Sequence, residues 1–281
     1  MKKITNSGIL IREQNIILGL SLPLVALLLA CSAVGLLDRG IYQSSTLNWM
    51  TQTVVQDGVN LFLIAPVLVV AALYSFQGVK FAYLMWGGTV SYLVYTFLIY
   101  CFSVPFNILF LPYCLVLGLS SFSLFWFVTT QARTPVVTKL ESKFILRASG
   151  IYFIIISVLF YVLWLREIIP AALSNEIPDT LTESGLLTNP VQAIDLSIFL
   201  PVVFVAGVMA IKAKPLAAIL IPVILIFFIL MDVTIAALTI VLRQNGLGGS
   251  LLIPLAMGIL AFFSFTLLIA FVRSTRDELS S

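Results

Sequence analysis

The sequence predicts an all-α fold, a polytopic membrane helix bundle with eight transmembrane helices, and three observations carry this prediction. Of the 281 residues, 61% are hydrophobic and only 10% are charged. A soluble domain carries about 25% charged residues and has too much surface to hide such an apolar excess. Eight apolar stretches each approach the ~20 residues that cross a bilayer core. The period-two alternation of a membrane β-barrel is missing from the sequence.

The predicted spans are separated by short polar connectors, except for two longer loops. One long loop runs from Asp38 to Asp57 and the other from Arg166 to Asp195. Several spans contain proline, which membrane helices tolerate because neighbouring groups satisfy the freed carbonyl. The predicted spans cover residues 16–37, 58–76, 81–102, 107–129, 148–165, 195–211, 216–241 and 250–272.

The basic residues predict a multi-pass protein of the plasma (cell inner) membrane with both termini in the cytoplasm. Cytoplasmic loops carry an excess of Lys and Arg. With the N-terminus inside, the outer side receives only Arg39, Arg166 and Arg243 of the 15 basic residues. The cytoplasmic side receives Lys2, Lys3, Arg12, Lys80, Arg133, Lys139, Lys143, Arg147, Lys212, Lys214, Arg273 and Arg276.

The first span has a second interpretation. Residues 28–32, which end on Cys31 and Ser32, resemble a bacterial lipoprotein cleavage box, and cleavage would make Cys31 a lipid anchor. The long segment before the apolar run, which contains Glu13, favours an uncleaved helix instead.

Composition excludes several kinds of chemistry. The chain contains no histidine, which excludes His-ligated haem, His-bound zinc and Ser-His-Asp catalysis. Cys31, Cys101 and Cys114 form no CxxC pair, so thiol redox chemistry is not indicated and we expect small buried hydrophobes. No GxxxxGK nucleotide loop occurs. We therefore expect no cofactor, no metal and no nucleic acid; the lipid bilayer is the expected partner, and a small-molecule or ion ligand and a protein partner stay open.

The sequence predicts an internal repeat that divides the chain into two halves. Residues 56–67 resemble residues 191–202 when Pro66 is aligned with Pro201, which matches Asn60 with Asp195. Each segment follows a long outer loop and precedes a basic turn. We expect residues 1–129 and 148–281 to be parallel four-helix halves, joined by a basic linker at 130–147. Chance likeness between apolar helices is the alternative.

The candidate site residues are polar groups within or beside the spans. A charge inside the bilayer costs at least about 2.5 kcal/mol, so it is expected to face the bundle interior. Asp232 lies deep in span seven, where it either serves a function or joins helices. Asp57 lies at the predicted start of span two, where helix capping is the alternative role. The full set of substrate-site or ion-site candidates is Asp57, Asn60, Asp195, Asp232, Arg39, Arg166, Tyr92 and Tyr95.

Three features together resemble a group of uncharacterised bacterial multi-pass membrane proteins. They are the QD-to-N opening of span two, the tyrosine-rich SYLVYTFLIYCF of span three and the NPVQAIDL entry to span six. The group carries no assigned activity, so the resemblance implies a topology and no mechanism.

The sequence leaves three function classes open. A non-catalytic membrane component, such as a sensor, an assembly factor or a complex subunit, is the leading interpretation for a chain without a motif. A small-solute, proton-coupled or cation-coupled transporter, with an outward-facing polar site between the halves, is the alternative. An intramembrane or lipid-modifying enzyme is less favoured, because Asp57 and Asp195 are its only candidate acid–base pair. Convergence of the polar residues on one cavity would favour transport or catalysis over a scaffold.

Overall fold

The computed structural model describes residues 11–137, 142–275 and 279, and these residues contain helices and no β-strand. Eight helices or continuous helical segments are long and apolar enough to cross a membrane, which confirms the predicted fold class. The six long single helices are α1 (Ile11–Leu37), α4 (Lys80–Ser103), α5 (Phe110–Arg133), α6 (Lys143–Ser174), α10 (Ala217–Gln244) and α11 (Leu252–Ser274). The other two segments are α2 (Leu47–Val59), η2 (Asn60–Ile64) and α3 (Ala65–Phe76), and then α8 (Pro190–Ile194), η3 (Asp195–Phe199) and α9 (Leu200–Ile211).

Span two begins eleven residues earlier than the predicted residue 58. Thr46 caps the segment, because its Oγ1 accepts a hydrogen bond from the amide of Trp49 at 3.2 Å. The sequence prediction missed this part of the span because α2 is rich in polar residues. Its buried positions face other helices rather than lipid. The predicted loop therefore shortens to the 3₁₀ turn η1 (Arg39–Tyr42) and its flanks.

The second long loop is also partly helical. α6 continues to Ser174 beyond the predicted end at 165, and the short helix α7 (Asp179–Ser184) follows. Asn189 caps α8, with its Oδ1 accepting from the amides of Val191 and Gln192. Thr46 donates to the carbonyl of Ser184 at 2.9 Å, so the two long connections touch.

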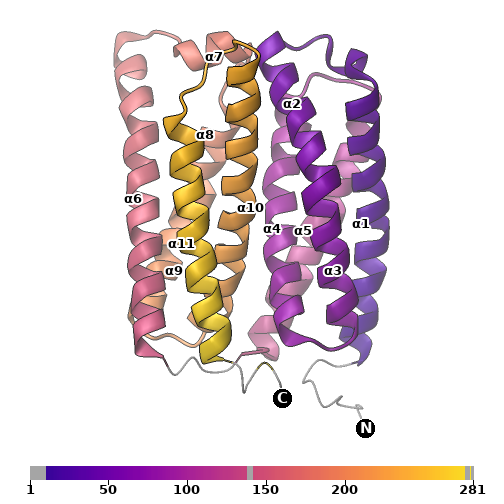
Figure 1. The fold of residues 1–281 in the computed structure, drawn as a ribbon, viewed down its shortest axis with the longest axis vertical. Helices are drawn as coiled ribbons and strands as arrows, with labels where there is room; N and C mark the ends of the chain where they lie inside the picture. The colour runs from indigo at the N-terminus through magenta and orange to yellow at the C-terminus, as the bar shows by residue number, and fades with distance from the viewer. Residues whose placement is uncertain (1–10, 138–141, 276–278, 280–281) are drawn as a thin grey trace.

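The bundle consists of two groups of helices that meet along α4 and α10 (Figure 1). In the first group, α1 packs on α3 and α4 packs on α5. In the second group, α6 packs on α9 and α10 packs on α11. Across the junction α4 contacts both α10 and α8, while α10 contacts α2. Each central helix therefore reaches the opposite group.

The two spans that contain Pro66 and Pro201 each hold a π-helical turn just before the proline-containing α-helix. Proline has no amide hydrogen and its ring collides with the carbonyl four residues earlier in a regular α-helix. The wider π-helical turn avoids this collision. In it the amide of Ala65 donates to the carbonyl of Asn60, and the amide of Leu200 donates to that of Asp195. Asn60 and Asp195 thus occupy the same local structure, as the sequence alignment matched them; the repeat of the two whole halves stays a prediction.

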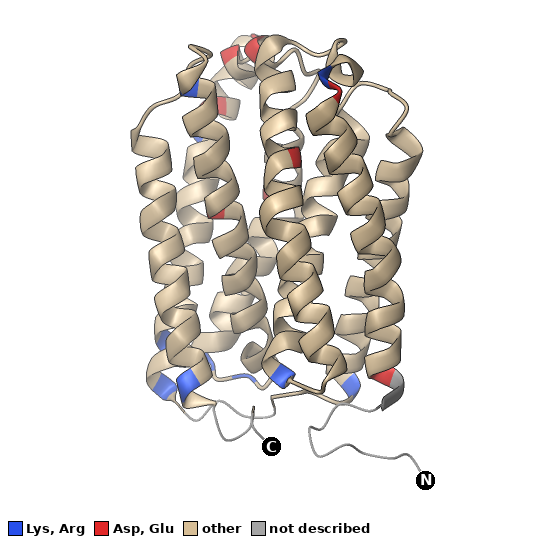
Figure 2. Ribbon diagram, turned by 45° about the vertical axis from the view of Figure 1, so that its right-hand side comes forward, with Lys and Arg blue, Asp and Glu red and all other residues tan. Residues whose placement is uncertain are grey.

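Side chains of opposite charge gather at opposite ends of the bundle. Figure 2 shows most Lys and Arg positions at the end where α1 begins and α11 ends, and most Asp and Glu positions toward the other end. This is the pattern that the orientation prediction requires. Lys2, Lys3, Lys139 and Arg276 lie outside the described residues.

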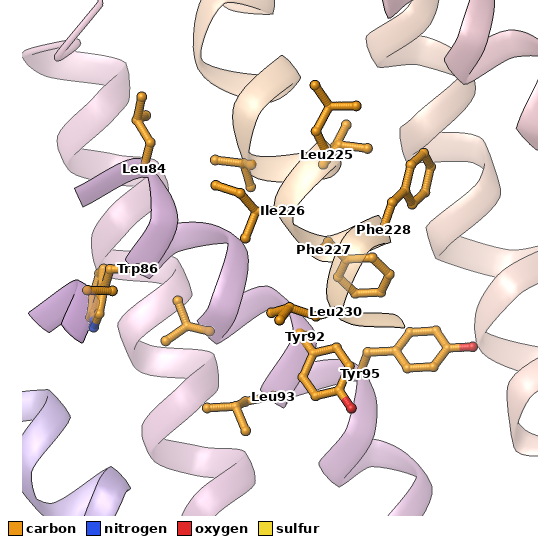
Figure 3. Close-up of a cluster of buried hydrophobic side chains, with 14 of the residues drawn as sticks. Leu84, Trp86, Tyr92, Leu93, Tyr95, Leu225, Ile226, Phe227, Phe228 and Leu230 are labelled. Carbon is orange, nitrogen blue, oxygen red and sulfur yellow. The ribbon is translucent and has the colours of Figure 1, made fainter. Parts of the chain in front are cut away.

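The junction between α4 and α10 is filled with large apolar and aromatic side chains (Figure 3). Gly88 allows the close approach, since a Cβ at this position would lie 2.9 Å from the carbonyl oxygen of Val223. Beyond it, the rings of Tyr92 and Tyr95 pack on Phe227, with centroids 6.2 and 5.6 Å from it. Tyrosine hydroxyls therefore enter the centre of the molecule from α4.

Candidate functional site

Asp57 is enclosed by aromatic hydroxyls in the first group of helices. Its side chain is only 1% exposed. Its Oδ2 accepts from the hydroxyl of Tyr42 at 2.7 Å and its Oδ1 accepts from that of Tyr100 at 2.8 Å. Gly35 of α1 faces the carboxyl group, where no larger residue leaves room. Helix capping, the alternative role for Asp57, does not hold, because the residue lies ten positions into a helical segment that Thr46 caps.

Tyr42 reaches this carboxyl group from the outer turn η1. Its hydroxyl also lies 3.1 Å from the hydroxyl of Tyr113 on α5, and because Tyr42 donates to Asp57, Tyr113 is the donor in that pair. Burial, followed by the negative charge of Asp57, raises the pKa of Tyr42 well above its ordinary value. Tyr42 consequently stays protonated and acts as a permanent donor to Asp57.

Asp195 is held in a comparable way in the second group. Its Oδ1 accepts from the hydroxyl of Tyr95 on α4 at 2.9 Å, and its Oδ2 accepts from the indole nitrogen of Trp164 on α6 at 2.8 Å. Asp57 and Asp195 were expected to pair with Arg39 or Arg166. The structure instead gives them aromatic donors, and both arginines are exposed. Aromatic donors are favoured over arginine here because a guanidinium brought to this depth would lose its hydration, which costs free energy.

Asn60 belongs to a third polar cluster, between the two groups of helices. The side-chain nitrogen of Gln56 donates to Asn60 Oδ1 at 3.0 Å and to the hydroxyl of Tyr92 at 2.9 Å. Tyr92 in turn is hydrogen-bonded to Thr234 of α10 at 2.8 Å. The Nδ2 of Asn60 is buried and has no partner among the described residues. A single helix, α4, thus supplies a tyrosine to each of the three clusters.

Asp232 lies apart from these clusters, near the middle of α10. One turn earlier, the ring of Phe228 packs on Tyr152 of α6 with centroids 6.0 Å apart. The hydroxyl of Tyr152 is bonded to Ser264 of α11 at 2.9 Å. Asp232 is 7% exposed, and its Oδ2 has no hydrogen-bond partner in the described part of the chain.

The buried polar candidates fall into separate hydrogen-bonded clusters. Two surface hollows lie along α11: Arg273 and Thr266 help to line one, and Phe262 and Pro254 the other. None of the eight candidate residues lines either hollow. Within the described ranges, no group of three or more His, Cys, Asp and Glu side chains is placed to hold a metal ion.

Several partners escaped the sequence analysis. None of the candidate residues named from the sequence is Trp164, Tyr100 or Tyr113, and Tyr42 and Gln56 lie in no pattern that sets them apart. One signal in the sequence was available: Tyr95 and Tyr100 lie five residues apart in one apolar span, and each buried hydroxyl needs a hydrogen-bond partner.

Comparison with protein-family models, curated proteins and solved structures gives no significant match. The class of protein therefore rests on the structure: within the described residues it is an all-α bundle with eight membrane-length apolar helices, consistent with an integral membrane protein. Two of its buried acids, Asp57 and Asp195, accept hydrogen bonds from tyrosine and tryptophan side chains.

Proposed function

We propose that this protein is a non-catalytic component of a membrane, acting as a sensor, an assembly factor or a subunit of a larger complex. One observation carries the proposal. Both carboxyl oxygens of Asp57, and both of Asp195, accept hydrogen bonds from side chains of neighbouring helical elements. A carboxylate that is fully engaged inside a bundle fixes helices to one another. A substrate proton or cation would have to compete with these donors for the carboxylate oxygens.

A proton-coupled or cation-coupled transporter is the second candidate, and Asp232 is the observation that favours it. A carboxylate at this depth with an unpaired oxygen must carry a proton, meet a cation or meet water, because nothing else offsets its desolvation. The bonded hydroxyls of Tyr152 and Ser264 are further polar groups in this region, because Tyr152 packs on Phe228, one turn before Asp232.

Proton flux into liposomes separates the two candidates. The purified protein is reconstituted with an internal pH-sensitive dye, and a potassium gradient with an ionophore drives proton entry. We expect the entry rate to equal that of protein-free liposomes and to be unchanged in Asp232→Asn. The exposed Asp179 of α7 supplies the control variant Asp179→Asn. Flux that is present in the parent and in the control but lost in Asp232→Asn would overturn the proposal in favour of transport.

The proposed orientation places both termini in the cytoplasm of a plasma (cell inner) membrane. It is supported by the basic end of the bundle, which holds the start of α1 and the end of α11 (Figure 2). Cysteine-accessibility labelling of intact cells should reach residues 40–46, 175–189 and 244–249, and should leave residues 131–146 unlabelled until the membrane is permeabilised. Labelling of 131–146 in intact cells would reverse the orientation.

A further inference from the structure

The hydroxyl of Tyr100 has two acceptors within reach, and both belong to α2. It lies 2.8 Å from Asp57 Oδ1 and 3.3 Å from the carbonyl oxygen of Thr53. A tyrosine hydroxyl carries one proton, so it donates to one of these acceptors at a time. The carboxyl oxygen is the nearer acceptor. The carbonyl oxygen is therefore a second position to which the same hydroxyl can turn, since a carbonyl has two lone pairs.

The other oxygen of Asp57 has a donor that does not change. Tyr42 donates to Oδ2 at 2.7 Å, and the oxygen of Tyr42 lies 3.1 Å from the hydroxyl of Tyr113. Tyr42 is held in this direction because Tyr113 is its donor. A proton that joins Asp57 is therefore placed on Oδ1, on the side where the donor can turn away.

We propose that Asp57 is a reversible proton-binding site in which Tyr100 reverses its hydrogen bond. In the charged state Tyr100 donates to Oδ1. When a proton leaves a hydronium ion and forms an O–H bond at Oδ1, the new hydroxyl donates to the oxygen of Tyr100, and Tyr100 turns to donate to the carbonyl of Thr53. No other covalent bond changes. Each hydroxyl of the cluster keeps an acceptor in both states, so protonation leaves no buried donor unpaired.

Asp195 lacks this second arrangement, although it is also a buried acid with two donors. The indole nitrogen of Trp164 is a donor only and cannot accept a hydrogen bond from a protonated carboxyl group. On the other oxygen, the hydroxyl of Tyr95 bonds to Asp195 alone among the described residues. A proton on Asp195 would therefore meet a donor that has no other acceptor. The difference between the two acids makes Asp57 the proton site.

The groups that face Asp57 bring no positive charge. Cys31 lies one turn before Gly35, the residue of α1 that meets the carboxyl group, and Arg39 at the start of η1 is exposed. The titratable groups around the carboxyl group are the hydroxyls of Tyr42 on η1, Tyr100 on α4 and Tyr113 on α5, and the thiol of Cys31 on α1. The carboxylate charge is therefore offset by hydrogen bonds alone, and a proton removes that charge without bringing in another atom.

The proposal deepens the sensor role proposed above and rests on it, because it names a proton as the signal. The hydrogen bond that changes joins α2 to α4. The same helix α4 supplies Tyr92 and Tyr95 to the other two clusters. A proton on Asp57 therefore alters how the central helix α4 is bonded to the first group of helices.

Infrared spectroscopy of the purified full chain in liposomes tests proton binding directly. A protonated carboxyl group shows the C=O stretch of a carboxylic acid, which a carboxylate lacks. Spectra are recorded while the pH is lowered from alkaline to mildly acidic and then raised again. We expect a carboxylic acid band that appears and disappears reversibly in the parent protein, persists in Asp195→Asn and is missing from Asp57→Asn. The same band in the parent and in Asp57→Asn at every pH would overturn the proposal. That result would leave the proposed function standing, because proton flux tests it separately.

Thermal unfolding provides a second measurement. Asparagine imitates a protonated carboxyl group, because its side-chain nitrogen donates where a carboxylate oxygen accepts. Asp57→Asn should lower the unfolding temperature less than Asp195→Asn, since only Tyr100 can turn to another acceptor. The exposed Asp179→Asn is the control and should leave the unfolding temperature unchanged. The proposal also fails if Asp57→Asn does not fold, or if its unfolding temperature falls as far as that of Asp195→Asn.

Discussion

Adding one methyl group at Gly35 is expected to break the Asp57 cluster and to destabilise the fold by about 3 kcal/mol. In Gly35→Ala the new Cβ would lie 1.9 Å from Asp57 Oδ2 and 2.6 Å from the hydroxyl of Tyr42. The carboxyl group cannot retreat without losing the hydrogen bonds from Tyr42 and Tyr100. Either the carboxyl group of Asp57 moves away from its donors or α1 moves away from α2. Both outcomes leave buried polar groups without hydrogen-bond partners.

Gly19 on the same helix provides the matched control. A Cβ at Gly19 meets nothing within 4 Å, so Gly19→Ala should leave stability unchanged or raise it slightly through helix propensity. Thermal unfolding of both variants in one detergent measures the difference. Equal unfolding temperatures for Gly35→Ala and the parent protein would show that Asp57 is not held where the structure places it.

The topology of the bundle could be predicted from sequence because the bilayer dictates it. Apolar length, the basic turns and the prolines at 66 and 201 carry that information in local sequence. The start of span two could not be located, since α2 is polar on the face that packs against other helices. Burial of Thr53 and Asp57 depends on neighbouring helices that hydropathy does not register.

The candidate site was predictable only in part. The depth of Asp195 and Asp232 pointed to buried acids, and Tyr95 was among the expected neighbours. Their other partners depend on how each helix is rotated about its axis, which no local pattern records. Tyr42 reaches Asp57 through the fold of an outer turn, and Trp164 reaches Asp195 through the register of α6 against η3.

The strongest packing constraint in the second group is the meeting of α6 and α9 at two glycines. A Cβ on Gly150 would lie 2.7 Å from the carbonyl oxygen of Gly207, and a Cβ on Gly207 would lie 2.8 Å from that of Gly150. Backbone atoms cannot rotate aside as a side chain does, so an alanine at either position must push the helices apart. Small residues permit this kind of approach between membrane helices.

Gly150→Ala and Gly207→Ala should each destabilise the protein by about 1–3 kcal/mol. Separation of the helices also weakens two hydrogen bonds beside Pro201: Ser157 donates to the carbonyl of Leu200 at 3.1 Å, and Tyr161 donates to that of Leu196 at 3.0 Å. The double variant should cost less than the sum of the single variants, because both methyl groups drive the same displacement.

Gly258→Ala on α11, where a Cβ meets nothing within 4 Å, is the control for these variants. Thermal unfolding in a single detergent again provides the measurement. Because the carbonyls near Pro201 orient the turn that carries Asp195, loss of the α6–α9 contact should also weaken the bond from Trp164, visible as a change in tryptophan fluorescence. Additive effects from the two glycines, or a stable double variant, would mean that α6 and α9 do not meet at this point.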